Sequence, residues 1–98
     1  GMIGLLCIQA VRLAGFARVI AVDLDDQKLQ LAKQLGADTI LNAKQCDVPA
    51  EVYKLTGNLG ADAALEVVGA TPTVQSAINS VRRGGAVTLV GNLAPKVE

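Results

Sequence analysis

Apolar and polar positions along the chain follow two alternating periods, which predict helices and strands in turn. Apolar residues recur at helical spacing from Leu5 through Leu13, directly after a turn at residues 1–4, and predict an amphipathic helix there. The pattern beyond it predicts strands at residues 18–23, 39–41, 61–68 and 86–90, and helices at residues 25–35, 47–55 and 71–81. Alternation of this kind is typical of an α/β protein with a parallel sheet.

Two of the predicted helices carry further detail in their sequences. The helix that begins at residue 25 has an apolar stripe made of Leu29, Ala32 and Leu35. The last predicted helix has its final apolar position at Val81, and two arginines follow it directly. Positive charges at the C-terminal end of a helix offset its dipole, so these arginines are assigned that role.

The length of 98 residues suits one small domain. A doubly wound dinucleotide-binding sheet normally has about six strands, and the first of them precedes a glycine-rich turn. The expected fold is therefore α/β, a partial Rossmann-type doubly wound parallel sheet formed by residues 1–98, with the first strand and the C-terminal part missing. That first strand would normally take the centre of the sheet.

The amino-acid composition bears on whether the protein binds nucleic acid or a membrane. Nine basic residues balance nine acidic ones and 51% of the residues are apolar, so the sequence carries no excess of positive charge for nucleic acid or an anionic membrane. Arg12 interrupts the first apolar segment well before the roughly 20 residues of a membrane span, and no signal-peptide pattern is recognised. We therefore expect no nucleic-acid or membrane partner and a cytoplasmic location.

The two cysteines form no metal-ligand pattern. Cys7 falls in the first predicted helix, Cys46 falls in a polar loop, and the chain contains no histidine. Structural zinc sites need Cys and His ligands at close spacing. No metal site is therefore expected in this segment, and the cysteines are interpreted as a small buried thiol and a surface thiol.

The strongest chemical signal combines the glycine turn with an acidic residue. Gly1 and Gly4 precede the first predicted helix, so that backbone amides at a helix N-terminus can meet a pyrophosphate. Asp23 follows at the end of the apolar run Val-Ile-Ala-Val. An acidic side chain about 20 residues after such a turn accepts hydrogen bonds from both hydroxyls of a nucleotide ribose. Together the two features predict a dinucleotide site.

Asp23 has an alternative role as the N-terminal cap of the helix that follows it. Asp25 and Asp26 already serve that helix end, which favours ribose binding for Asp23, and the three carboxylates together would repel a 2′-phosphate and favour NAD over NADP. Lys28 is either an exposed helix lysine or a contact to the adenosine ribose. Glu66, within an apolar strand, is assigned a structural role because no partner in the sequence supports a catalytic base.

Four ordered segments carry a family resemblance along almost the whole chain. They are Gly-Met-Ile-Gly at residues 1–4, Val-Ile-Ala-Val-Asp at residues 19–23 followed by Lys-Leu-Gln-Leu-Ala-Lys-Gln-Leu-Gly-Ala-Asp at residues 28–38, Gly-Ala-Asp-Ala-Ala-Leu-Glu-Val-Val-Gly at residues 60–69, and Arg-Gly-Gly-Ala-Val-Thr-Leu-Val-Gly at residues 83–91. In this order they resemble the coenzyme domain of the medium-chain, zinc-dependent alcohol and polyol dehydrogenases, of the sorbitol or iditol dehydrogenase kind.

The resemblance implies a coenzyme, a substrate and a set of binding residues. Carried over by position, it implies pyrophosphate contacts at Gly1, Met2, Ile3 and Gly4, adenosine-ribose contacts at Asp23 and Lys28, and nicotinamide-side contacts at Val67, Val68, Val90 and Asn92. It implies NAD as coenzyme, an alcohol or polyol as substrate, and hydride transfer to the nicotinamide. Zinc polarises the alcohol oxygen in such enzymes, but neither its ligands nor a catalytic residue is expected in this segment. A homodimer or homotetramer is expected of the full-length protein.

Two other classes of function use a similar crevice. An S-adenosylmethionine-dependent methyltransferase also holds a ribose with an acidic residue after its second strand, although the segments at residues 60–69 and 83–91 resemble dehydrogenases instead. A non-catalytic NAD-sensing module would bind the same coenzyme but lack a metal and a substrate pocket. Competition between NADH and S-adenosylmethionine, and zinc ligands in the flanking sequence, distinguish these readings from a dehydrogenase.

Overall fold

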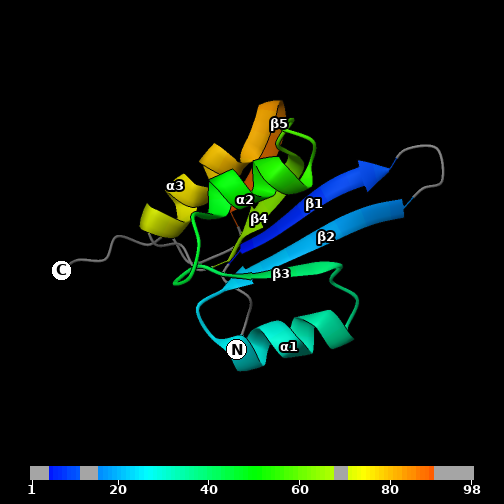
Figure 1. The fold of residues 1–98 in the computed structure, drawn as a ribbon. Coiled ribbons are helices and arrows are strands. Elements are labelled where there is room, and N and C mark those ends of the chain that lie inside the picture. The colour runs from blue at the N-terminus through cyan, green and yellow to red at the C-terminus, as the bar shows by residue number, and fades with distance from the viewer. Residues whose placement is uncertain (1–4, 12–15, 68–70, 90–98) are drawn as a thin grey trace.

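The computed structural model describes residues 5–11, 16–67 and 71–89, which form a five-stranded sheet with helices on both faces (Figure 1). The strands are β1 (Leu5–Val11), β2 (Phe16–Asp23), β3 (Thr39–Asn42), β4 (Ala61–Glu66) and β5 (Val81–Leu89). The helices are α1 (Asp26–Gln34), α2 (Val48–Leu55) and α3 (Thr71–Ser80).

The order of strands in the sheet is β3-β2-β1-β4-β5. β2 pairs with β3, and β4 with β5, in parallel, whereas β1 is antiparallel to both of its neighbours. Leu5 lies opposite Val22 on one side and Glu66 on the other. It follows that β2, β3, β4 and β5 all run in one direction and that their carboxyl ends lie at one edge of the sheet.

The helices enclose the sheet from two sides, as a doubly wound arrangement requires. α1 packs against β2 and β3 on one face, while α3 packs against β4 and β5 on the other with α2 beside it (Figure 1). The core is a cluster of small and branched apolar side chains from β2, α2, β4 and α3, namely Ile20, Val22, Val48, Val52, Ala61, Ala64 and Ala77. Burial of these side chains is the main stabilising contribution to the fold.

Most of the predicted elements are confirmed with small shifts in their ends. β2 and β3 include the strands predicted at residues 18–23 and 39–41, and α1 and α2 lie within the helices predicted at residues 25–35 and 47–55. Asp25 is the N-cap of α1, where its side chain accepts two backbone N–H groups, and Asp47 is the N-cap of α2, where its side chain accepts the N–H of Ala50. Short polar caps directly before apolar periodicity make these boundaries readable from sequence.

The prediction of a helix from Leu5 to Leu13 is wrong in this structure. Residues 5–11 are strand β1, which lies between β2 and β4 at the place in the sheet expected for a missing first strand. An apolar run of this length fits a buried strand as well as a helix. Without β1, β2 and β4 would each leave a row of backbone N–H and C=O groups without partners, and this pairing satisfies them.

Two expectations for helix faces and ends are also corrected. In α1, Leu29 is 2% exposed and Ala32 is half-buried, but Leu35 is the C-cap residue and is 79% exposed, so it does not belong to the buried stripe. α3 ends at Ser80, and Val81 begins β5 opposite Ala61. Strand pairing takes Val81 out of the helix, and β5 starts before the predicted residue 86.

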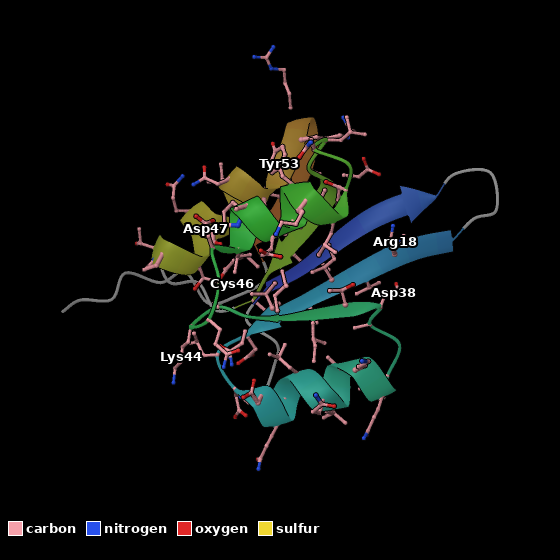
Figure 2. The ribbon with its side chains drawn as sticks, in the orientation of Figure 1. Arg18, Asp38, Lys44, Cys46, Asp47 and Tyr53 are labelled. Atoms are coloured by element: carbon pink, nitrogen blue, oxygen red, sulfur yellow. The ribbon has the colours of Figure 1, made fainter. Side chains whose placement is uncertain are left out.

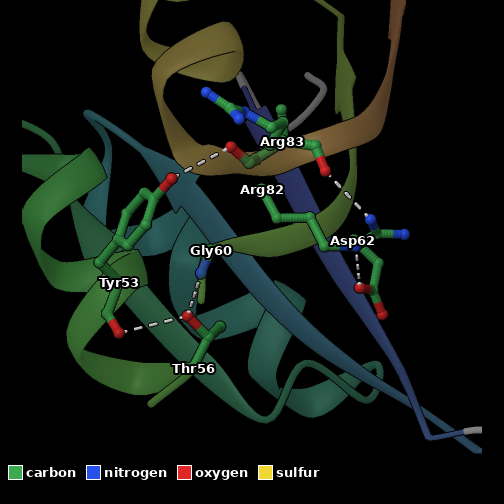
Figure 3. Close-up of polar contacts among 7 residues, drawn as sticks. Tyr53, Thr56, Gly60, Asp62, Arg82 and Arg83 are labelled. Atoms are coloured by element: carbon green, nitrogen blue, oxygen red, sulfur yellow. Dashed lines mark hydrogen bonds and ion pairs between the residues drawn. The ribbon is translucent and has the colours of Figure 1, made fainter. Parts of the chain in front are cut away.

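A polar cluster closes the amino ends of β4 and β5, at the edge opposite Asp23 (Figure 3). The Tyr53 hydroxyl donates to the carbonyl of Val81 at 3.3 Å, and the backbone N–H of Gly60 donates to the buried Thr56 Oγ1 at 2.8 Å. Arg82 Nε donates to Asp62 Oδ1 at 2.7 Å. Arg82 therefore joins β5 to β4. The role predicted for it from the sequence, at the C-terminal end of the last helix, is wrong.

Candidate functional site

The candidate site lies at the carboxyl edge of the sheet, where three strands end in polar residues. Asp23 ends β2, Asn42 ends β3 and lies opposite Asp23 in the ladder, and Glu66 ends β4. Leu5, the residue after Gly4 in sequence, pairs with Val22, the last residue but one of β2, and with Glu66, the last residue of β4. Ligands of open α/β sheets bind outside this edge, so the structure brings Asp23 and Val67 to the expected place.

Asp23 is half-buried and shapes the loop that follows it. Its Oδ1 accepts the backbone N–H of Leu24 at 2.7 Å and that of Asp25 at 2.9 Å. The N-cap of α1 is Asp25, whose Oδ1 accepts the amides of Gln27 and Lys28 at 2.8 and 3.4 Å. The capping alternative for Asp23 is thereby excluded, because the cap of α1 is Asp25, two residues nearer to the helix.

Asn42 belongs to this edge and was missed in the sequence. Its Nδ2 donates to Asp26 Oδ1 at 2.8 Å and to the carbonyl of Leu24 at 3.3 Å, while its Oδ1 accepts the N–H of Lys44 at 2.8 Å. The only signal for it was an asparagine directly after a predicted strand, next to a polar turn. Its partners in the loop, Leu24 and Asp26, are 18 and 16 residues away, so spacing gave no indication of them.

Comparison with known proteins identifies the group to which this arrangement belongs. Residues 3–98 match the family model described as zinc-binding dehydrogenase. The chain belongs to the zinc-binding dehydrogenase family. This confirms the resemblance found in the sequence, and with it the α/β Rossmann-type fold.

Individual relatives give the same result. The chain is 40% identical over 91 residues to an alcohol dehydrogenase of Cupriavidus necator and 37% identical over 91 residues to the sorbitol dehydrogenase of Bacillus subtilis, covering 93% of this chain and 25% and 26% of theirs. The solved alcohol dehydrogenase TADH from Thermus sp. ATN1 superimposes with a TM-score of 0.73 at 35% identity, over 79% of this chain and 22% of that one. The chain thus spans about a quarter of the length of these dehydrogenases.

Of the other predicted contacts, two fall on described residues. Lys28 is half-buried in the first turn of α1, and Val67 is half-buried directly after β4. Neither position decides whether the side chain meets a coenzyme, and both assignments stay predictions. The remaining members of the predicted set lie outside the described residues: Gly1, Met2, Ile3, Gly4, Val68, Val90 and Asn92.

Replacement of the first predicted helix by β1 also changes the argument for pyrophosphate binding. The predicted role depends partly on backbone amides at the N-terminus of a helix starting after Gly4. Residues 5–11 are a strand, so this helix does not support the assignment in the structure. For this dehydrogenase-family chain, pyrophosphate binding at residues 1–4 rests on the resemblance alone.

Glu66 is fully buried at the end of β4. Its backbone pairs with Leu5 and Leu89 on the two neighbouring strands. A side chain at this depth does not point out into solvent. Its position on a strand paired on both sides agrees with the structural role expected from the sequence.

Within residues 5–11, 16–67 and 71–89, no three side chains of His, Cys, Asp or Glu come together in a group that could hold a metal ion. Over the same residues, the helices are too short or too polar to cross a membrane.

Cys46 is the described cysteine whose surroundings affect its chemistry. Its thiol donates to the carbonyl of Asn42 at 3.5 Å, and its side chain packs against the core cluster, so it is half-buried and not the surface thiol expected (Figure 2). Burial, with smaller contributions from the negative charges of Glu51 and Asp47, raises the pKa of the Cys46 thiol above its ordinary value. A raised pKa means less thiolate at a given alkaline pH.

We expect Cys46 to react slowly with iodoacetamide at about pH 8, because the thiolate is the reactive form. Glu51→Gln removes one of the nearby negative charges and is expected to increase the rate. Asp38→Asn, at the opposite end of β3 (Figure 2), serves as the matched control and should leave the rate unchanged. Peptide mass spectrometry measures the rate at Cys46 separately from other cysteines. A rate equal to that of an unstructured cysteine peptide would contradict the expectation.

Proposed function

We propose that this chain is the NAD-binding part of a zinc-dependent dehydrogenase that oxidises an alcohol or a sugar alcohol. The observation that carries the proposal is the position of Asp23 at the carboxyl end of β2 in a chain of the zinc-binding dehydrogenase family. The substrate class is supported by the names of the relatives, alcohol dehydrogenase and sorbitol dehydrogenase.

In this proposal the Asp23 carboxylate accepts hydrogen bonds from the two hydroxyls of the adenosine ribose. Hydrogen bonds to an ionised group contribute about 1.5–3 kcal/mol each. Asp25 and Asp26 add negative charge within the same loop, and a 2′-phosphate would have to approach all three carboxylates. NAD is therefore preferred over NADP, and Lys28 is proposed as a second contact to the same ribose.

The other coenzyme contacts follow the family resemblance. Gly1, Met2, Ile3 and Gly4 are proposed to bind the pyrophosphate through their backbone. The nicotinamide end is proposed to lie near Val67, which directly follows β4, and near the segments that contain Val68, Val90 and Asn92. This arrangement sets the coenzyme across the carboxyl edge of the sheet, where open α/β sheets bind their ligands.

Zinc, when bound, supplies a Lewis acid that polarises the alcohol oxygen so that hydride can pass from the substrate carbon to the nicotinamide. The described residues offer no group of ligands that fits such an ion. Zinc is therefore proposed for the remaining length of the protein, of which the chain is about a quarter by comparison with its relatives. The full-length protein is proposed to be a homo-oligomer.

The direct test is an assay of the full-length protein with NAD and either sorbitol or a secondary alcohol, following the formation of NADH. We expect NAD-dependent oxidation that falls at least about 100-fold when zinc is removed by a chelator, because the metal contributes several kcal/mol to the transition state. Added zinc should restore the rate. If the protein binds NAD but holds no metal and oxidises neither alcohol, the proposed dehydrogenase activity is contradicted and a non-catalytic NAD-sensing module is favoured. Binding of S-adenosylmethionine instead of NAD would favour a methyltransferase.

A further inference from the structure

We propose that Asn42 is a positioning residue for coenzyme binding, because it holds the Asp23 loop, residues 23–26, against the end of β3. The inference rests on the proposed function and adds a residue to it. Asn42 itself is not proposed to touch the coenzyme. It acts by fixing the direction in which the Asp23 carboxylate leaves the sheet.

The contacts of Asn42 connect two elements that the sheet ladder alone would leave loosely joined. The ladder between β2 and β3 ends at the pair Asp23 and Asn42, followed by the bond from the N–H of Ala43 to the carbonyl of Asp23 at 3.0 Å. Beyond that point, the side-chain amide Nδ2 spans the gap to the carbonyl of Leu24 at 3.3 Å and to Asp26 Oδ1 at 2.8 Å. One side chain thus fixes both the middle and the end of the Asp23 loop.

The chemistry of an amide suits this position. Nδ2 donates two hydrogen bonds toward the loop while Oδ1 accepts the N–H of Lys44 at 2.8 Å, which fixes the orientation of the amide plane. A carboxylate at residue 42 could accept from Lys44 but could donate neither bond, and it would face the carboxylate of Asp26. The loop already carries three acidic side chains, so a neutral donor joins it to β3 without adding charge.

A loop held in this way presents Asp23 in one arrangement before the coenzyme arrives. When the binding-competent arrangement is only partly populated, the apparent dissociation constant rises in inverse proportion to that population. A fall to roughly a tenth would weaken coenzyme binding about tenfold. The hydride-transfer rate at saturating NAD should not change, since the loop lies at the adenosine end of the proposed site.

The test uses the full-length protein and titrations with NADH and with ADP-ribose. Asn42→Asp is expected to raise the dissociation constants of both ligands about tenfold, with kcat unchanged. The double variant Asn42→Asp with Asp26→Asn exchanges donor and acceptor, and is expected to recover much of the affinity. Asp26→Ala, at an exposed position, removes one of the two acceptors and should weaken binding in the same direction. Asn79→Ala, at an exposed position on α3, is the matched control.

The outcomes separate this inference from the function on which it rests. Unchanged NADH affinity in the folded Asn42→Asp and Asp26→Ala variants would overturn the role of Asn42 while leaving NAD binding intact. A loss of affinity that the exchanged pair does not recover, or an equal loss in Asn79→Ala, would also overturn it, because a general loss of stability would then explain the data. A wild-type protein that binds neither NADH nor ADP-ribose would instead refute the proposed function itself.

Discussion

Replacing Gly60 by alanine is expected to destabilise the fold by at least about 3 kcal/mol. Gly60 has a φ of +90°, and a Cβ added there would lie 2.8 Å from the backbone nitrogen of Arg82 and 3.0 Å from its Cα. Both are backbone atoms of the neighbouring strand, so they cannot turn aside as a flexible side chain would. The substitution therefore combines a backbone conformation unfavourable for alanine with a collision between the starts of β4 and β5.

Gly57 offers a matched control three residues earlier in the same loop. It also has a positive φ, +65°, but an added Cβ would meet nothing within 4 Å. Gly57→Ala is therefore expected to lower the free energy of unfolding by about 1–2 kcal/mol, through the unfavourable backbone conformation alone. Urea unfolding of the two variants and of the wild type measures the difference. Equal destabilisation by both substitutions would contradict the close packing of Gly60 against β5.

Replacing Asp23 by asparagine is expected to weaken NADH binding roughly 10–100-fold, with a smaller effect on NADPH. Asparagine keeps an Oδ1 that can accept the amides of Leu24 and Asp25, so the loop retains its shape. The substitution removes the negative charge, which would strengthen the hydrogen bonds donated by the ribose hydroxyls and would repel a 2′-phosphate. The preference for NADH over NADPH should therefore fall along with the affinity.

Asp38→Asn provides the matched control for this substitution. Asp38 stands before β3, and its Oδ2 accepts the N–H of Val19 at 2.7 Å at the opposite edge of the sheet (Figure 2). The same chemical change there should leave the titration curves of NADH and NADPH unchanged. Equal affinities for NADH in the wild type and in Asp23→Asn would remove Asp23 from the coenzyme site.

The parts of the fold that could be predicted are those in which local chemistry and tertiary packing agree. Residues 16–42 have a branched apolar strand, an aspartate cap and an amphipathic helix in sequence, and the structure has β2, α1 and β3 there. Residues 5–11 illustrate the opposite case, because their apolar run satisfies both a helix and a buried strand. The unpaired edges of β2 and β4 decide between the two, and β4, at Ala61–Glu66, lies far along the chain from residues 5–11. Since β2 and β4 run parallel to each other, a parallel strand would also fit between them, with a different set of hydrogen bonds.

The candidate site shows the same division. Asp23 could be found because the end of an apolar strand and the distance from a glycine turn are both local features. Asn42 could not, since its role depends on hydrogen bonds to Leu24 and Asp26, which β3 pairing brings beside it. Arg82 was misassigned for a related reason, because its partner Asp62 lies on a different strand.

We propose that this chain binds the adenosine ribose of NAD at the carboxyl edge of its sheet through Asp23. A crystal structure of the full-length protein with NADH tests it most directly. We expect both adenosine-ribose hydroxyls to lie within about 3 Å of the Asp23 carboxylate oxygens, with Asn42 still hydrogen-bonded to Leu24 and Asp26. A coenzyme bound elsewhere, or a ribose whose hydroxyls are held by other groups beyond hydrogen-bond distance of Asp23, would contradict it.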